Sequence, residues 1–179
     1  MRQVAIFLCC ASLLLCLVSG PAYAVYTFKP DAEPDGFRGI KWGAALKDLK
    51  DMVPAPADPA MKNVERYTRK ADRMKMGEAT ILSVHYLFWR GRFMGAVVTA
   101  TGNRNWLGLR EAVFDRFGEG DQPNPYKEYY TWEGYRSSMV LQYNRVTDTC
   151  ELWLSSIEIA AEAEKDGGKT KEKDAGADF

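Results

Sequence analysis

Apolar residues recur along the chain either with the spacing of a helix face or with the alternation of a strand. The order of these segments predicts an α+β fold. Residues 44–53 and 105–117 carry apolar side chains at the spacing of one helix face. Alternation of apolar and polar residues, which is typical of half-buried strands, fills most of the remaining chain up to Ile159. The expected strands are 64–70, 80–89, 92–101, 127–132, 137–143 and 150–159.

These elements predict a two-layer domain, with an antiparallel sheet of about six strands and two main helices packed on one face. Arg90-Gly91 is a two-residue connection of the kind that forms a tight hairpin. Gly118 follows the second helix as its stop signal. A helix followed by three strands occurs twice, which indicates a tandem α-βββ duplication.

Residues 1–24 have the pattern of an export signal. Arg2 gives a positive start, an apolar run covers residues 4–18, and Ala22-Tyr23-Ala24 matches the small-x-small motif of a cleavage site. Each of the cysteines Cys9, Cys10 and Cys16 follows a Leu or Cys, whereas a lipidation motif has a small residue there. We expect a Sec-type signal, cleavage before Val25, and an unlipidated periplasmic or secreted protein.

The remaining chain divides into three parts. Residues 25–36 contain two prolines and three acids and predict an extended lead-in. Residues 37–161 hold all the periodic segments and predict a single α+β domain. Residues 162–179 are almost free of apolar side chains, which predicts a disordered charged tail.

Charge excludes some classes of partner. The chain carries 24 basic and 24 acidic side chains, and Arg2 is the only charge within 1–24. The mature chain therefore has one net negative charge, which argues against a nucleic-acid partner and against adhesion to an anionic membrane surface. No later segment is long and apolar enough for a membrane span.

Few residues after the signal suit metal binding or nucleophilic catalysis. His85 is the only histidine, and Cys150 is the only cysteine after residue 24, so neither a zinc site nor an internal disulfide is expected. A serine hydrolase would depend on His85 without a nucleophile-elbow motif. Glu111 and Asp115 lie one helical turn apart beside Arg110 and Arg116, the pattern of a solvated salt-bridged face. No cofactor and no catalytic residue is assigned.

The aromatic residues predict a binding surface. Alternation in 80–89 points Leu82, Val84, Tyr86 and Phe88 toward the helices, and therefore points His85 and Trp89 to the other face. The same reasoning puts Trp153 on that face. An open sheet face with exposed aromatic rings is typical of a partner or ligand surface. A loop, the proline-rich segment or a second copy could instead cover these rings. Trp89, Trp153 and His85 are the candidate binding residues.

Three motifs carry a resemblance to a family: Phe37-x-Gly39-Ile40-x-Trp42-Gly43, Tyr86-x-Phe88-x-x-Gly91-Arg92-Phe93 and Arg116-Phe117-Gly118. They resemble a recurrent set of exported bacterial proteins. Their helix-plus-antiparallel-sheet module is similar to those of the outer-membrane assembly lipoprotein BamE and the β-lactamase inhibitor protein. The resemblance covers roughly residues 37–159, and it implies a binding or assembly module without transferring functional residues.

We therefore expect an exported, non-catalytic binding or assembly module of the cell envelope, whose partner is an envelope protein or another envelope component. The alternative is a carrier of a small apolar or carbohydrate ligand stacked on the tryptophans. A carboxylate-based hydrolase is a third class. The sequence leaves the oligomeric state open.

Overall fold

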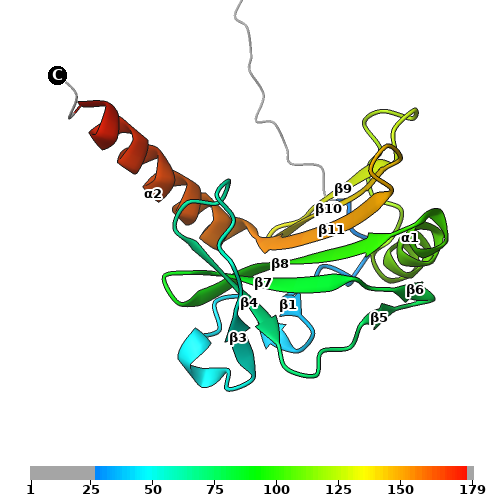
Figure 1. Cartoon of the computed structure of the whole chain (residues 1–179). Helices are drawn as coiled ribbons and strands as arrows, with labels where there is room; N and C mark the ends of the chain where they lie inside the picture. Colours follow the sequence, from blue (N-terminus) through cyan, green and yellow to red (C-terminus); the bar gives the residue numbers. More distant parts are fainter. Residues whose placement is uncertain (1–26, 177–179) are drawn as a thin grey trace, which may run out of the picture.

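The computed structural model describes residues 27–176 (Figure 1), so the expected signal 1–24 and its cleavage site lie outside the described residues. The fold is α+β, as predicted, and centres on a seven-stranded antiparallel sheet. In spatial order its strands are β3 (Met52–Pro54), β4 (Val64–Arg69), β7 (Ser83–Trp89), β8 (Arg92–Thr101), β11 (Thr149–Ser156), β10 (Ser137–Asn144) and β9 (Tyr129–Glu133). Two small hairpins are β1 (Gly36–Phe37) with β2 (Ile40–Lys41), and β5 (Lys75–Met76) with β6 (Ala79–Thr80).

Helix α1 (Asn103–Phe117) covers one face of the sheet and closes the main core. Its Trp106, Leu109 and Val113 are at most 1% exposed, in agreement with the predicted helical stripe. The sheet contributes Val84, Tyr86 and Phe88 of β7, which confirms the predicted alternation for these residues. Leu82, which was also expected to face the helices, lies before β7 and is 63% exposed. Gly108 lets α1 approach β6 closely, because a Cβ there would lie 2.9 Å from the backbone nitrogen of Ala79.

Residues 44–53 do not form an α-helix, although their apolar spacing predicts one. They form a short 3-10 helix, η1 (Leu46–Asp48), followed by β3. The segment is held by the hairpin end of β8, since Leu46 N donates to Gly91 O over 2.8 Å and Ala45 bridges Arg92. Tertiary hydrogen bonds to the start of β8 therefore replace the local helical preference. The unit after it, from α1 to β11, does contain a helix and three strands, and the duplication stays a prediction.

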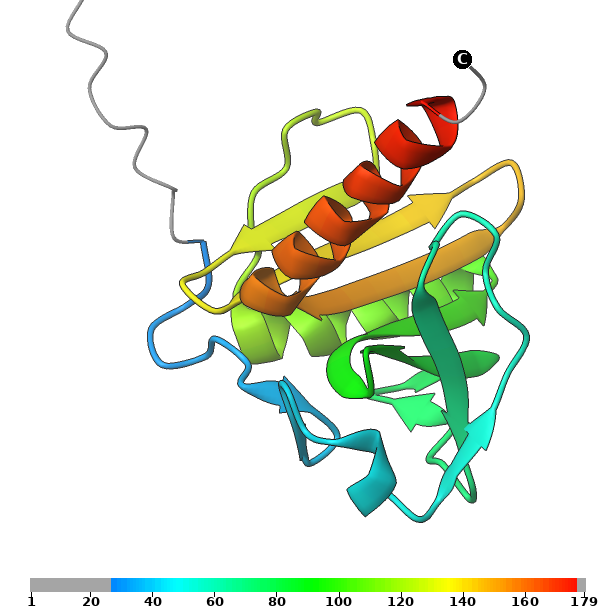
Figure 2. The same cartoon turned by 90° about the vertical axis from the view of Figure 1, so that its left-hand side faces the viewer.

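The second main helix is α2 (Ile157–Gly176), which begins directly after β11. Figures 1 and 2 show it on the opposite side of the sheet from α1, with its far end extending past the sheet. Ile159, Ala160 and Ala163 pack there in a second apolar cluster. This arrangement differs from the expected two helices on one face. The helix also continues well beyond Ala161, where the sequence predicts a disordered tail.

The lead-in is part of the fold over its described residues. Phe28 is only 4% exposed and belongs to the main core. Thr27 N donates to Glu133 O over 3.0 Å, and Lys29 N donates to Phe117 O over 2.8 Å. Within residues 27–176 no helix has the length and apolar character needed to cross a membrane.

Candidate functional site

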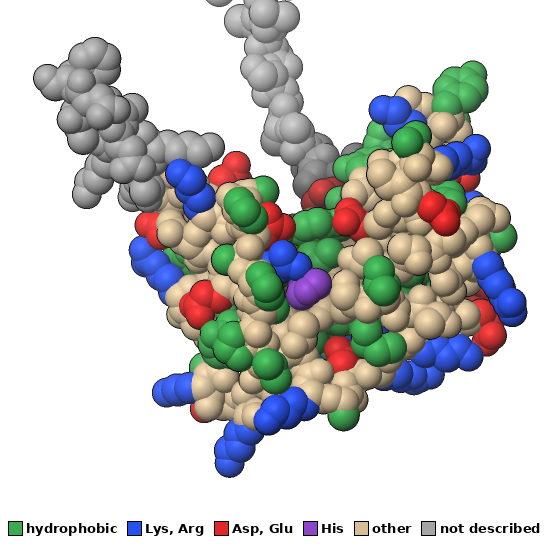
Figure 3. All heavy atoms as spheres, viewed as in Figure 1, with side chains coloured by type: hydrophobic (Ala, Val, Ile, Leu, Met, Phe, Trp, Pro, Cys, Tyr) green, Lys and Arg blue, Asp and Glu red, His purple; other side chains and the backbone are tan. Residues whose placement is uncertain are grey.

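The structure places the three predicted site residues on the sheet face opposite α1, here called the outer face. Strand register aligns Thr131, Val140, Trp153, Val97 and His85 in one row across β9, β10, β11, β8 and β7. Trp89 lies further along β7, beside Val64 of β4. Figure 3 shows the His85 ring in a shallow depression on this side of the molecule.

Trp89 is not an exposed anchor, because α2 and its neighbours cover it. The side chain is 3% exposed and belongs to the same apolar cluster as Ile159. Guanidinium groups of Arg90 and Arg92 lie 4.6 and 4.9 Å from its ring centroid. Arg92 in turn pairs with Glu162 of α2, and Arg90 pairs with Asp166 at 3.0 Å. Trp89 therefore helps to hold α2 on the sheet.

Trp153 and His85 remain partly accessible. Trp153 Nε1 donates to Glu151 Oε2 over 3.2 Å, and Gln142 Nε2 donates to the same oxygen over 2.8 Å. Burial lowers the pKa of His85 below its ordinary 6.5, and the positive charge of Arg66 lowers it further. The imidazole is therefore neutral at pH 7, with one ring nitrogen able to donate and the other able to accept.

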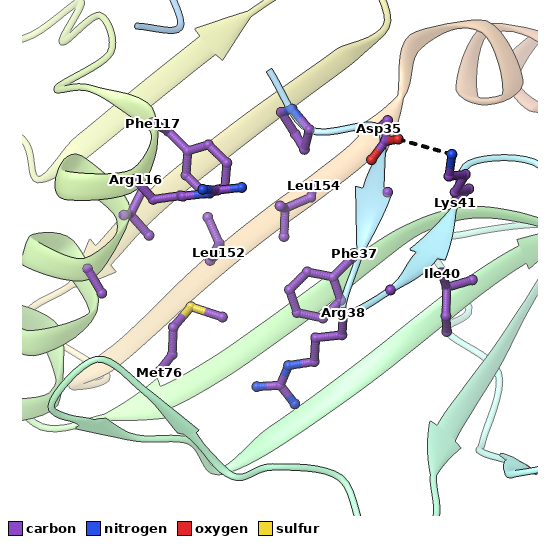
Figure 4. A pocket seen from close by; sticks show the side chains of 15 residues that line it. Asp35, Phe37, Arg38, Ile40, Lys41, Met76, Arg116, Phe117, Leu152 and Leu154 are labelled. Carbon is purple, nitrogen blue, oxygen red and sulfur yellow. Dashed lines mark ion pairs between the residues drawn. The ribbon is translucent and has the colours of Figure 1, made fainter. Parts of the chain in front are cut away.

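A second surface lies on the α1 side, between α1 and the β1–β2 hairpin (Figure 4). Both elements rest on the same sheet face, and the gap between them is a cavity of about 410 Å³. Leu152 and Leu154 of β11 lie within this gap, which we call the slot. Its other apolar lining side chains are Pro34, Phe37, Ile40, Met76, Ala112, Val113 and Phe117.

The β1–β2 hairpin forms one wall of the slot, and its turn geometry keeps this wall in place. Arg38 and Gly39 have φ of 49° and 81°, the two left-handed positions of a tight hairpin turn. A Cβ on Gly36 would lie 2.0 Å from Ile40 O, so only glycine allows the two strands to approach this closely. Arg38 adopts a conformation that is uncommon for its type. Its ion pair with Asp72, at 2.5 Å, holds it there.

Two arginines line the slot. Arg116 of α1 is exposed and packs over Phe117 with 6.0 Å between guanidinium carbon and ring centroid. Among the side chains of residues 27–167 it has no ion-pair partner. Figure 4 shows its guanidinium extending from α1 over the slot. Arg38 extends from the β1–β2 hairpin (Figure 4), and its ion pair with Asp72 connects it to the loop between β4 and β5. The slot is thus apolar inside, with the two arginines and the Lys41–Asp35 ion pair, at 3.6 Å, among its lining residues.

A network of polar side chains holds the end of the slot that Arg38 lines. Tyr86, which is fully buried, donates its hydroxyl to Asp72 Oδ2 over 2.9 Å. Arg69 Nη1 donates to Arg38 O over 3.2 Å, and Arg69 also pairs with Asp51. Burial raises the pKa of Tyr86 to about 12, and the hydrogen bond to Asp72 adds to this shift. The phenol therefore stays protonated and keeps donating to the carboxylate.

The remaining candidate reactive groups, Cys150, Glu111 and Asp115, lie outside both surfaces. Burial raises the pKa of the Cys150 thiol to about 11, with the Asp148 carboxylate adding to the shift, so the thiolate is scarce at neutral pH. Glu111 and Asp115 are exposed on α1. Within the described chain no cluster of three or more His, Cys, Asp or Glu side chains is arranged to hold a metal ion.

The slot was not predicted from the sequence. Its hairpin wall falls in the motif Phe37-x-Gly39-Ile40, which we used only for the family resemblance and did not predict to be a hairpin. The signal that could have revealed the hairpin is the pair Arg38-Gly39, which repeats the Arg-Gly pattern of the correctly predicted turn at Arg90-Gly91.

Comparison with family models, with curated proteins and with solved structures finds no match to this chain. The resemblance to exported helix-plus-sheet proteins therefore stays a prediction. The two surfaces are interpreted from their own residues.

Proposed function

We propose that this protein is an exported, non-catalytic binding module of the cell envelope, and that its ligand is a small molecule with an apolar chain that enters the slot. The observation that carries the proposal is the apolar cavity between α1 and the β1–β2 hairpin. Its volume of about 410 Å³ falls within the roughly 300–1,000 Å³ that is typical of ligand pockets.

The lining favours an aliphatic chain over a stacked sugar. Aliphatic side chains outnumber the two phenylalanines among the apolar residues that line the slot, and no tryptophan is one of its lining residues. On the outer face, the burial of Trp89 leaves Trp153 without a neighbouring exposed indole. A carbohydrate sandwiched between two tryptophans therefore has less support than an acyl chain in the slot.

Binding of N-phenyl-1-naphthylamine, an uncharged probe that fluoresces in apolar surroundings, tests this function. Met76→Trp should fill one end of the slot, because the half-buried Met76 side chain lines it. Met74→Trp is the matched control, since Met74 is 42% exposed on the same loop and does not line the slot. We expect Met76→Trp to weaken probe binding about tenfold and Met74→Trp to leave it unchanged.

Displacement of the probe by dodecanol is the second measurement. Dodecanol should compete in the wild type and in Met74→Trp. If the probe does not bind, or binds both variants as it binds the wild type, the slot is not a ligand site. A thermal melt of each variant separates loss of binding from loss of folding.

A second candidate function is protein binding through the outer face, which the accessible Trp153 and His85 favour. Glu151 orients the Trp153 indole, and His85 stands in the same cross-strand row. Large, oriented aromatic side chains are common anchors in interfaces. Crosslinking within the envelope should then give a defined adduct that Trp153→Ala removes and that the slot variant Met76→Trp retains. An adduct that persists in Trp153→Ala would count against the outer face.

A further inference from the structure

A basic depression adjoins the slot at the loop between β4 and β5. We call it the bowl, and its volume is about 580 Å³. Its charged lining residues are Arg38, Asp51, Arg69, Lys70, Asp72, Arg73 and Lys75. Five cations thus face two carboxylates, so the bowl carries a net positive charge within a chain that has equal numbers of basic and acidic residues.

Three of the five cations have an ion pair among the described side chains, and two do not. Arg38 pairs with Asp72, and Arg69 pairs with Asp51. Lys70 and Arg73 are exposed and have no ion pair with the side chains described, those of residues 27–167, and Lys75 pairs with Glu78 at 3.8 Å. The unpaired positive charge therefore lies on the loop that forms the rim of the bowl.

The bowl and the slot share walls. Arg38 and Met76 line both cavities, so the slot and the bowl are neighbours that meet at these two side chains. The shared wall is rigid, because Asp72 accepts from both Arg38 and the buried Tyr86. On the other side of the loop, Gly77 packs tightly against α1, since a Cβ there would lie 2.6 Å from Ala112 Cβ. Such fixed surroundings lower the cost of ordering a site on binding.

We propose that the slot and the bowl together bind one anionic amphiphile, with its alkyl chain in the slot and a phosphate monoester group in the bowl. The inference rests on the proposed function for the chain-binding half. A phosphate group has up to two negative charges and three terminal oxygens, which match several Lys and Arg donors around a wide bowl. A single carboxylate would leave most of that charge without a partner.

Dodecyl phosphate, dodecanol and inorganic phosphate are the probes, each measured by displacement of N-phenyl-1-naphthylamine or by calorimetry. Lys70→Glu/Arg73→Glu reverses two exposed cations of the bowl. Lys47→Glu/Lys127→Glu is the control with the same change in charge, at exposed positions that line neither cavity. We expect the first double variant to weaken dodecyl phosphate binding about tenfold or more, with dodecanol unaffected. The control should bind both ligands as the wild type does.

Two further experiments test where the head group binds and whether the bowl binds free phosphate instead of an amphiphile. Arg116→Glu should cost less dodecyl phosphate affinity than the bowl variant, and the opposite order would move the head group to the α1 end and overturn the proposal. Excess inorganic phosphate should compete with dodecyl phosphate but not with dodecanol. Tight binding of inorganic phosphate by itself, without any gain from the alkyl chain, would make the bowl a free-anion site and also overturn it. Equal affinity for dodecanol and dodecyl phosphate would show that the bowl does not bind the head group, while the slot would still bind the chain. If neither ligand binds, the proposed function itself is wrong.

Discussion

Tyr86 donates its hydroxyl to Asp72 over 2.9 Å and thereby links the centre of the sheet to the loop that joins the slot and the bowl. The same carboxylate holds Arg38 in the turn of the β1–β2 hairpin. One buried acid thus fixes two walls of the candidate site. The geometry of the site should depend on this phenol even though Tyr86 lines neither cavity.

Tyr86→Phe should lower the free energy of unfolding by about 1–3 kcal/mol, because a buried hydrogen bond to a charged acceptor is lost. Tyr67→Phe is the control, since its hydroxyl bonds the exposed Glu65 over 2.9 Å. It should cost less than about 1 kcal/mol. Urea denaturation midpoints provide the measurement. Equal costs for the two variants would show that the Tyr86–Asp72 bond has no special weight.

Stability should decline in alkaline solution between about pH 9 and pH 12. The pKa of Cys150 rises from 9.0 to about 11 on burial, and the pKa of Tyr86 rises from 10.0 to about 12 for the same main reason. The fold therefore favours both neutral forms. Their stabilisation is complete below the unfolded-state pKa values and is lost as the pH rises through the folded-state values.

The two groups can be separated by mutation. Cys150→Ala should make the decline that begins near pH 9 shallower, and Tyr86→Phe should do the same for the decline that begins near pH 10. Urea midpoints recorded along the pH series provide the comparison. A wild-type midpoint that stays constant up to pH 12 would contradict the assignment of both groups.

Local patterns predicted the parts of the fold that depend on sequence neighbours. The alternation of Tyr86 and Phe88 against His85 and Trp89 identified both faces of β7, because pleating imposes a period of two whatever packs on the sheet. The hairpin turn at Arg90-Gly91 was also predicted, and both residues have positive φ.

Long-range contacts account for the features that the sequence did not predict. The helical spacing of 44–53 is overridden by hydrogen bonds to the start of β8, and the partners of α2 lie about seventy residues earlier in the chain, as in the pairing of Arg92 with Glu162. Glu162 therefore looks like the start of a solvated tail until the folded position of Arg92 is known. The slot was missed for the same reason, since its walls come from α1, β11 and the β1–β2 hairpin.

Trp89→Ala should cost about 3–5 kcal/mol of folding stability, because it opens a cavity beneath α2. Strand alternation alone predicted an exposed Trp89 ring, and the 3% exposure of this side chain contradicts that prediction. Trp153→Ala is the comparison, since Trp153 lies on the same face and is only half-buried. It should cost clearly less in the same urea series. If Trp153→Ala proved the more destabilising change, α2 would not be docked over Trp89 in solution.

His85 should titrate below pH 6.5, and its environment allows a direct test because it is the only histidine in the chain. Burial lowers the pKa, and the Arg66 guanidinium, which lies 3.7 Å from Asp58, adds a positive charge nearby. The fold disfavours the imidazolium, so stability is complete above pH 6.5 and falls as the pH drops toward the folded-state pKa. Proton NMR of the single imidazole gives that value. Arg66→Ala should raise the pKa partway toward 6.5 while burial keeps it lowered, and Arg104→Ala, an exposed arginine on α1, should leave it unchanged. A wild-type value at or above 6.5 would mean that His85 is solvated and that the depression around it on the outer face is open to water.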